Sequence, residues 1–586
     1  MRSSTIVSLT LSALMALPLS GCIGALEDAP DGPRGTGPRD PGGNPGDPPE
    51  PVGPGGEPLP MPPSDPEALC EGVAPGPRVL RLLTRAEYRA TAASLLFVTE
   101  PDIDRLPIET RVRGYDDIAS QQAITPVHAE EHAALASALA EEAVATSLDR
   151  LLPGCAAGSP GCDRAFIERF GRRAFRRPLS GEEITRYLGL FDPALTTGDF
   201  RVGVQLVVEA MLQSPYFLYR HEVGEPVGDG TYALTSHEIA SALSYTFWGT
   251  MPDDALDALA DRDGLRDTAA IEAEARRLLA DRRARPRIAD FFTQWLGTTT
   301  LLSTNKDTAV FPQFTPEVRR AMADEERLFV ESVIWGDSHR FADLFDADYV
   351  FANDVLARYY GLPSPGGTAL SRVALSGEAA SQRGGVLRLG SVLASHAHAN
   401  ETSPVRRGLM VRDRLLCQHF EAPPGLDITP PGLDPSLTTR DRFARHTSDP
   451  SCQSCHQFID GVGFSFERYD GAGMYRTTEH GLPVDDSGVL VGATRLSDGT
   501  SIDYHGPGEL SAMLAESQAA EACVARQWWR WSRGVVEDEL GPDECAVRQL
   551  AHDLRESDGD LVHLFVVALS QPSFLIRRAD VVTEEM

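Results

Sequence analysis

Residues 83–97 read LTRAEYRATAASLLF, and this stretch opens with the pattern that begins an α-helix. The Thr84 hydroxyl can accept a hydrogen bond from the N–H three residues later, while Glu87 reaches back to the N–H of Thr84. The same capping box recurs in SGEEITRYLGLF from residue 180 and in TSHEIASALSYTFW from residue 235, each time before apolar residues at helical spacing. Strand-like alternation is scarce outside a short hairpin expected near residues 488–491. The sequence therefore predicts a mainly α fold with little β structure.

The charge of the chain excludes one class of partner. Lys and Arg number 54 against 85 Asp and Glu in 586 residues, which gives a formal net charge of −31. Affinity for nucleic acid comes from Lys and Arg that neutralise phosphates, so a nucleic-acid partner is not expected. No P-loop, no GxGxxG before a helix and no Ser-His-Asp order is visible, so nucleotide binding and hydrolysis are not expected either.

The first residues carry an export signal. Arg2 precedes an apolar run from Ile6 to Leu19, which is too short to span a bilayer as a mature helix. LSGC at residues 19–22 resembles the lipobox of bacterial lipoproteins, which implies cleavage of a signal peptide (residues 1–21) and lipidation of Cys22. The alternative is an ordinary secretory signal. A lipidated Cys22 would anchor the protein to a lipid bilayer, and Ile23 in place of Asp favours the outer membrane, on its periplasmic or cell-surface face.

One short motif carries chemistry. Cys452-Gln453-Ser454-Cys455-His456 is a CxxCH, the attachment signature of c-type haem. Cys452 and Cys455 fall on one face of a helical turn, so both thiols can bond to one haem, and His456 can bind the iron as proximal ligand. A structural zinc site would need two more ligands, and a redox dithiol would need a βαβ setting. The motif therefore predicts one covalent haem c.

Seven further cysteines accompany this motif. With Cys22 assigned to lipid, six remain, an even number in an oxidising compartment, which favours disulfides. Cys155 and Cys162 bracket a short flexible loop, and Cys523 and Cys545 bracket a Trp-rich helix and a turn. The predicted pairs are Cys155–Cys162, Cys523–Cys545 and, by elimination, Cys70–Cys417.

The segment HTSDPSCQSCHQFIDGVGFSFERYDGAGMYR, residues 446–476, resembles a family of secreted cytochrome-like proteins of planctomycetes and myxobacteria. Those proteins carry domains of unknown function 1587, 1595, 1592, 1588 and 1585 in series. Strings from LLTRAEYRATAASLL through FGRRAFRRPLSGEEITRYLGLF, LSYTFWGTMPDDAL and GSVLASHAHANETSPVRRGLMVRDRLLC to CVARQWWRWSRG resemble them in order. The family usually has Arg where this chain has Met474, and Arg or a similar residue in place of Glu401. The resemblance implies a haem protein of the cell envelope without an established substrate.

These observations divide the chain into expected domains. Residues 31–66 contain 22 Pro and Gly among 36 positions, a composition typical of a solvated tether. The expected order is a lipoprotein signal peptide (1–21), the lipidated Cys and tether (22–69), helical modules (70–140, 160–225 and 226–375), a cytochrome c-like haem module (376–490) and a C-terminal helical module (491–586).

The sixth iron ligand is open at the level of sequence. Met474, in a glycine-rich loop just after the motif, is the possible distal ligand in the predicted site. The other candidates are Met513, His396, His398, His446, His480 and His505. An iron without a sixth protein ligand is the remaining alternative, and it would indicate peroxidase-like or ligand-sensing chemistry.

Charged residues flank the motif. The basic ones could pair with haem propionates or form a solvated face; they are Arg406, Arg407, Arg440, Arg442 and Arg476. Asp460, Glu467 and Asp470 follow the motif and could be turn and cap residues or a docking surface for a basic redox partner.

The sequence leaves three functions open. The first is a membrane-tethered monohaem lipoprotein that transfers electrons in the cell envelope. The second is a haem enzyme with an open distal site, and the third is a surface binding protein with a structural haem. An electron carrier is favoured over a stand-alone enzyme, with a redox protein as its possible partner.

Overall fold

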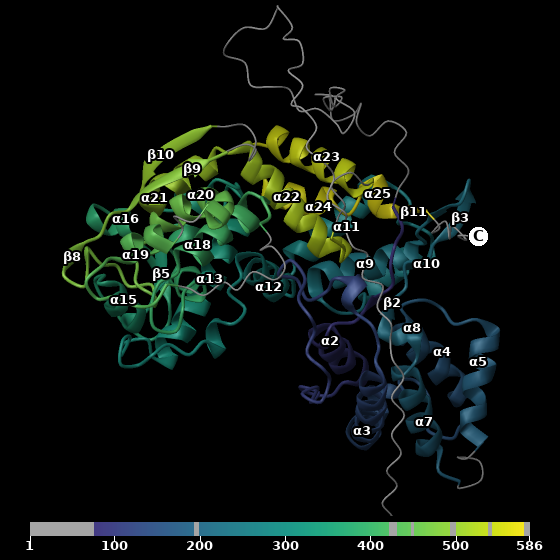
Figure 1. Ribbon diagram of the computed structural model, residues 1–586. Coiled ribbons are helices and arrows are strands. Elements are labelled where there is room, and N and C mark those ends of the chain that lie inside the picture. The colour runs from purple at the N-terminus through teal and green to yellow at the C-terminus, as the bar shows by residue number, and fades with distance from the viewer. Residues whose placement is uncertain are drawn as a thin grey trace, which may run out of the picture. The chain divides into compact units, whose positions relative to one another are not determined.

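The computed structural model describes residues 76–192, 198–420, 431–446, 450–492, 500–536 and 542–578. The predicted signal peptide, Cys22, the tether and Cys70 lie outside these residues. The chain divides into a unit of residues 1–62 and a unit of residues 63–586, and everything described below belongs to the second unit. In this part of the chain helices predominate and strands are short (Figure 1), which confirms the mainly α prediction.

The elements follow one another in five stretches. Residues 81–151 form β1 (Arg81–Leu82), α2 (Arg85–Leu96), η1 (Ala119–Gln121) and α3 (Pro126–Leu151). Residues 162–220 form α4 (Cys162–Phe175), α5 (Gly181–Leu188), η2 (Gly189–Phe191), α7 (Phe200–Leu212), α8 (Pro215–Leu218) and β2 (Tyr219–Arg220). Residues 225–374 form β3 (Glu225–Gly228), β4 (Thr231–Ala233), α9 (Ser236–Trp248), α10 (Asp254–Asp261), α11 (Thr268–Ala280), α12 (Ala284–Leu296), η3 (Leu301–Ser303), α13 (Pro316–Ile334), α14 (Asp343–Asp346), β5 (Tyr349–Ala352), α15 (Asp354–Tyr360) and β6 (Ser371–Ala374).

The remaining two stretches contain the motif and the C-terminal helices. Residues 378–491 form α16 (Glu378–Gln382), η4 (Val386–Arg388), α17 (Gly390–Ser395), α18 (Pro404–Leu409), the π-helix η5 (Met410–Leu415), α19 (Thr439–His446), α20 (Pro450–Phe464), β7 (Thr478–Glu479), β8 (Leu482–Pro483) and β9 (Ser487–Val491). Residues 501–578 form β10 (Ser501–His505), α21 (Gly506–Ala515), α22 (Gln518–Arg533), α23 (Pro542–Glu556), α24 (Leu561–Val567), α25 (Pro572–Leu575) and β11 (Ile576–Arg578).

The predicted capping boxes begin their helices as expected. At α2, the Glu87 N–H donates to the Thr84 hydroxyl at 3.2 Å, and the Thr84 N–H donates to the Glu87 carboxylate at 3.1 Å. The reciprocal pair is also present at the starts of α5 and α9. Each box satisfies two N–H groups that a helix start leaves without an intrahelical partner. Local sequence therefore fixes these three helix starts.

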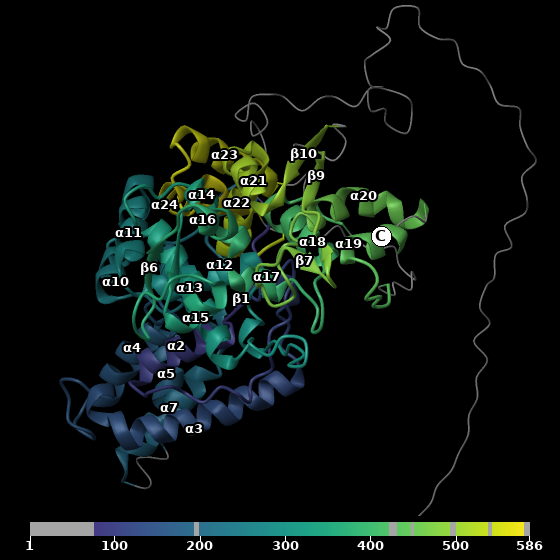
Figure 2. The same ribbon diagram turned by 90° about the vertical axis from the view of Figure 1, so that its left-hand side faces the viewer.

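Apolar packing among the described residues forms three clusters. One buries residues of α2, α3, α4 and α7, and α3 and α7 lie side by side in Figure 2. A larger cluster joins α9, α11 and α12 to α22, α23 and α24, with Trp528 and Trp529 fully buried. The third lies around Met322 of α13 and Leu356 of α15. None of the described helices combines the length and apolar composition that crossing a membrane requires.

Short antiparallel sheets join distant parts of the chain. β1 pairs with β2 through Arg81 opposite Arg220, and β11 pairs with β4. The hairpin expected near residues 488–491 is present as β9 paired with β10. A disulfide between Cys155 and Cys162 closes the short loop before α4.

A buried cluster of charges lies where these stretches meet. Oε1 of Glu87 lies 3.0 Å from Arg287 of α12 and 3.8 Å from Arg220 of β2. Arg81 of β1 lies 3.6 Å from Asp117, and the Arg287 guanidinium lies 4.1 Å from the ring centroid of Trp531 on α22. The cluster therefore links the N-terminal stretches to α12 through buried ion pairs, and α12 to α22 through a cation–π contact.

Candidate functional site

The CxxCH motif lies in the first half of α20, which packs lengthwise against α18 and alongside β9 (Figures 1 and 2). Two glycines allow the close approach of the helices. A Cβ on Gly463 would lie 1.9 Å from the carbonyl oxygen of Pro404, and a Cβ on Gly408 would lie 2.3 Å from that of Ile459. Because neither position has room for a side chain, the two helices meet backbone to backbone. This contact fixes where the motif lies.

The three motif residues come together as the sequence predicted from helical spacing. Cys452 and Cys455 are partly exposed and one turn apart on α20. The next residue, His456, has a side chain that is 20 % exposed, and its Nδ1 lies 2.8 Å from Oδ1 of Asp460. This contact occupies Nδ1 and leaves Nε2 as the nitrogen with which the ring could bind iron. Asp460 is thus a partner of the motif histidine, in addition to being a candidate turn, cap or docking residue.

η5 and the segment that follows it lie beside the same helix, α20. The Arg412 Nε donates to the carbonyl of Phe458 at 2.9 Å, and the ring centroids of Phe420 and Phe458 are 5.9 Å apart. His419, next to Phe420, has its Nδ1 2.9 Å from Oδ1 of Asp413. This second histidine–carboxylate pair could not be predicted from the sequence, because its spacing matches no helical repeat.

A disulfide ties this segment to α22. Cys417 is bonded to Cys523. The predicted pairs Cys523–Cys545 and Cys70–Cys417 are therefore wrong, although Cys545 is also disulfide-bonded. Spacing along the chain could not reveal the correct pair, because the contact between η5 and α22 is a tertiary one.

Arg407 has a structural role in the part of the chain around the CxxCH motif. It is 1 % exposed, and its guanidinium donates to four carbonyls, those of Leu393, Phe466, Tyr469 and Asp470. These bonds tie the chain after α20 to α17, so the Arg407 side chain is committed to the protein itself.

The other four flanking arginines also have protein partners. Arg406 donates to the carbonyl of Ala397, Arg440 to that of Ser487, and Arg442 pairs with Glu401, while Arg476 donates to Glu467 and Glu479. Glu401, which departs from the family pattern, thus has a partner of its own in Arg442. The structure gives these arginines partners within the protein, although Arg406 is exposed at the surface.

The two acidic residues after Asp460 are also engaged. Glu467 is buried and accepts from the Thr402 hydroxyl at 2.9 Å as well as from Arg476, and loss of hydration raises its pKa above the ordinary value. The Asp470 carboxylate accepts from the N–H groups of Ala472 and Met474 at 2.9 Å each. These contacts make Glu467 an internal ion-pair residue and Asp470 a turn residue.

The candidate distal ligands have varied surroundings. Met474 is partly buried against the third apolar cluster, which includes Leu301 and Met322. The His396 Nε2 lies 2.7 Å from the carbonyl oxygen of Leu296, and loss of hydration lowers the pKa of His396 to about 4. The carbonyl of His398 accepts from the Lys306 ammonium at 2.7 Å.

The remaining candidates belong to different elements of the fold. Met513 packs against the largest apolar cluster, and His480 and His505 are exposed. The side chain of His446 lies outside the described part of the chain. Within that part, no group of three or more His, Cys, Asp and Glu side chains is placed to hold a metal ion. Met474 as the distal ligand stays a prediction.

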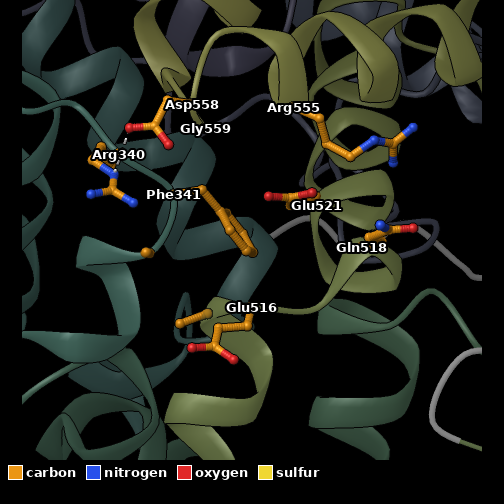
Figure 3. Close-up of a pocket in the computed structure, with 10 residues that line it drawn as sticks. Arg340, Phe341, Glu516, Gln518, Glu521, Arg555, Asp558 and Gly559 are labelled. Atoms are coloured by element: carbon orange, nitrogen blue, oxygen red, sulfur yellow. Dashed lines mark ion pairs between the residues drawn. The ribbon is translucent and has the colours of Figure 1, made fainter.

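A separate hollow of about 260 Å³ lies between the loop before α14 and the helices α22 and α23. Figure 3 shows the ring of Phe341 inside it, with Arg340 paired to Asp558 at 3.5 Å on one side and Glu521 and Arg555 on the other. Its polar lining is mostly charged and of both signs, and it contains no residue of the CxxCH motif.

Comparison with known families places domains along the chain. Four family models match, each described as a protein of unknown function: PSD3 (DUF1587) at residues 81–145, PSD5 (DUF1595) at 162–222, PSD4 (DUF1592) at 234–362 and PSCyt3 (DUF1588) at 383–479. The last match includes the whole CxxCH motif. The fifth domain of the series, 1585, stays a prediction. No curated protein and no solved structure matches the chain. The chain belongs to the family in which DUF1587, DUF1595, DUF1592 and DUF1588 follow one another in this order.

Proposed function

We propose that this protein is a cell-envelope lipoprotein that carries one covalent c-type haem and transfers electrons. The observation that carries the proposal is the geometry of α20: two thiols one turn apart, an imidazole beside them, and a carboxylate that holds the Nδ1 side of that imidazole. The name PSCyt3 of the matching family model, which hints at a cytochrome, also supports it.

The residues present fit a covalent haem. Cys452 and Cys455 are partly exposed on one side of a helix, so a planar macrocycle could reach both sulfurs and form two thioether bonds. His456 follows directly, and because its Nδ1 is occupied by Asp460, its Nε2 is the nitrogen that would bind the iron of a bound haem. When bound, the haem supplies a one-electron change between ferric and ferrous iron. The chain supplies attachment, the proximal ligand and a fixed orientation of that ligand.

The test of this proposal is the haem content of the exported protein. Protein extracted with acid-acetone should keep its Soret band and give a pyridine haemochrome of the two-thioether type. Cys452→Ser with Cys455→Ser should abolish this signal and leave most of the helical content. The matched control, Cys155→Ser with Cys162→Ser, removes the same number of thiols from a disulfide elsewhere and should keep the haem. Covalent haem in the first double variant would overturn the proposal.

A haem enzyme with an open distal site is the second candidate. It is favoured by the distal candidates themselves, since Met474 has an apolar packing environment and the His396 Nε2 has a carbonyl partner. Low-spin iron that is unaltered by cyanide and carbon monoxide would support electron transfer. High-spin iron that binds both would support the enzyme.

Anchoring by Cys22 is the last part of the proposal, and it rests on the lipobox-like LSGC and the Pro/Gly-rich tether. Several acyl chains on one residue hold a protein on a bilayer far more firmly than one chain does. Wild-type protein should partition into detergent and incorporate labelled palmitate, whereas Cys22→Ser should do neither. Recovery of unlabelled, buffer-soluble mature protein from wild-type cells would overturn the lipid anchor and place the protein in the periplasm or the medium.

A further inference from the structure

The Asp460 carboxylate differs from its neighbours in its partner. Other acidic side chains around α20 pair with arginine: Glu401 with Arg442, Glu467 and Glu479 with Arg476, and Asp486 with Arg468. Asp460 lies within 2.8 Å of the His456 ring instead, and within the described residues no Arg or Lys forms an ion pair with it. Its negative charge is therefore directed at the imidazole without being neutralised by a guanidinium.

The burial of Asp460 and its position on the helix hold this contact in place. Asp460 is 6 % exposed and lies four residues after His456, which places both side chains on one face of the helix. The neighbouring turn is held by Ile459 and Val462, which are 4 % and 0 % exposed. Because the helix is packed on this side, the carboxylate is shielded from water, and its hydrogen bond to the ring is stronger than an exposed one.

A carboxylate at Nδ1 has two chemical consequences. It accepts the proton of Nδ1–H, so the neutral ring is held in the tautomer whose lone pair is on Nε2. It also makes the imidazole a stronger electron donor through Nε2, since negative charge at one nitrogen increases the basicity of the other. A stronger donor favours ferric over ferrous iron.

We propose that Asp460 is a positioning residue that holds His456 in the Nδ1–H tautomer and lowers the reduction potential of the haem iron. This inference rests on the proposed haem function. It makes the protein a stronger reductant than the same haem protein without this carboxylate.

The first test uses the potential of the loaded protein. Asp460→Asn keeps the shape and removes the charge, so the midpoint potential should rise by about 59 mV or more, a tenfold change in the ferric-to-ferrous equilibrium. Asp460→Glu should restore part of this shift. Asp503→Asn removes an equal charge from an exposed position on β10 and should leave the potential unchanged.

The second test needs no haem and therefore stays informative if Asp460→Asn does not mature. In full-length Cys452→Ser/Cys455→Ser protein labelled with ¹⁵N-histidine, the neutral His456 ring should carry its proton on Nδ1. A His456→Gln variant identifies its signals. An Nε2–H tautomer, or a midpoint potential unchanged in Asp460→Asn, would overturn the role of Asp460 while leaving the haem proposal intact. Wild-type protein without covalent haem would overturn both.

Discussion

Glu87 and Arg287 are 200 residues apart in the chain, yet their charged groups lie 3.0 Å apart in the interior. The same Glu87 carboxylate closes the capping box of α2 through its other oxygen, which accepts from the Thr84 N–H at 3.1 Å. One side chain therefore begins a helix and also binds a second family domain, because residues 81–145 and 234–362 match different family models.

Removing the charge of Glu87 should loosen this junction. Glu87→Gln keeps an oxygen for the capping box but leaves the buried guanidinium of Arg287 without its closest counter-charge. We expect the free energy of unfolding to fall by about 3–5 kcal/mol, the usual cost of breaking a buried ion pair. Urea denaturation of the full chain measures it. The control, Glu317→Gln, breaks the exposed pair with Arg320 and should change little.

Glu325 should make stability depend on pH. It is fully buried and accepts from the Tyr360 hydroxyl at 2.5 Å, and loss of hydration raises the pKa of Glu325 to about 8. Between about pH 4.5 and pH 8 the folded state therefore binds more protons than the unfolded state, so stability falls as the pH rises through this range.

Unfolding midpoints across that range provide the measurement. Glu325→Gln should remove part of the slope and gain most at the alkaline end, whereas the exposed Glu130→Gln should keep the wild-type slope. A slope that is the same in Glu325→Gln and wild type would contradict the prediction.

Lys306 is the one lysine of the sequence, and its ammonium donates to the carbonyl of His398 at 2.7 Å. Loss of hydration, helped by nearby Arg407 and Arg406, lowers the pKa of Lys306 to about 7. After reductive ¹³C-methylation, its NMR signal should titrate with a midpoint near that value. Lys306→Arg should lack the signal and so distinguish it from the α-amine. Because the unfolded chain holds this proton up to about pH 10.5, Lys306 should make stability rise between about pH 7 and that value. A midpoint near 10.5 would show that the amine is hydrated.

How much of the fold the sequence could predict depends on how far apart along the chain the interacting residues lie. The capping boxes of α2, α5 and α9 were predictable because each involves residues three apart. The pairing of β1 with β2 was not, since it joins Arg81 to Arg220 across two family domains. The Cys417–Cys523 disulfide could not be predicted for the same reason. Its two cysteines are 106 positions apart, and only the packing of η5 on α22 brings them together.

In the candidate site, too, local features could be predicted from the sequence and tertiary contacts could not. The motif itself was evident, and a helical reading of residues 456–460 contained the signal for Asp460, since positions four apart share a face. Arg407 could not have been assigned, because its four partners are backbone carbonyls and carry no sequence signature. Side chains that bind backbone are the least visible to sequence reasoning.

Met474 is the residue whose role a spectrum can decide. Its contacts with the third apolar cluster lead us to expect that Met474→Leu leaves the ferric spectrum and midpoint potential of the haem protein unchanged. Met474→Ala should lower the free energy of unfolding by about 1–2 kcal/mol, as for a partly buried side chain. Loss of a weak long-wavelength band together with a lower potential in Met474→Leu would instead identify Met474 as the distal ligand.

The Cys417–Cys523 bond closes a covalent ring, and both motif cysteines lie inside it. Under the proposed function, the exported chain would meet an oxidising compartment with two sets of thiols whose fates must differ. One set would be oxidised to close the ring, and the other would be kept reduced until the proposed thioethers form. A cross-pairing of Cys452 or Cys455 with Cys417 or Cys523 would block both outcomes at once. The yield of mature protein should therefore depend on the thiol reductants and isomerases of its secretory host as much as on the stability of the fold.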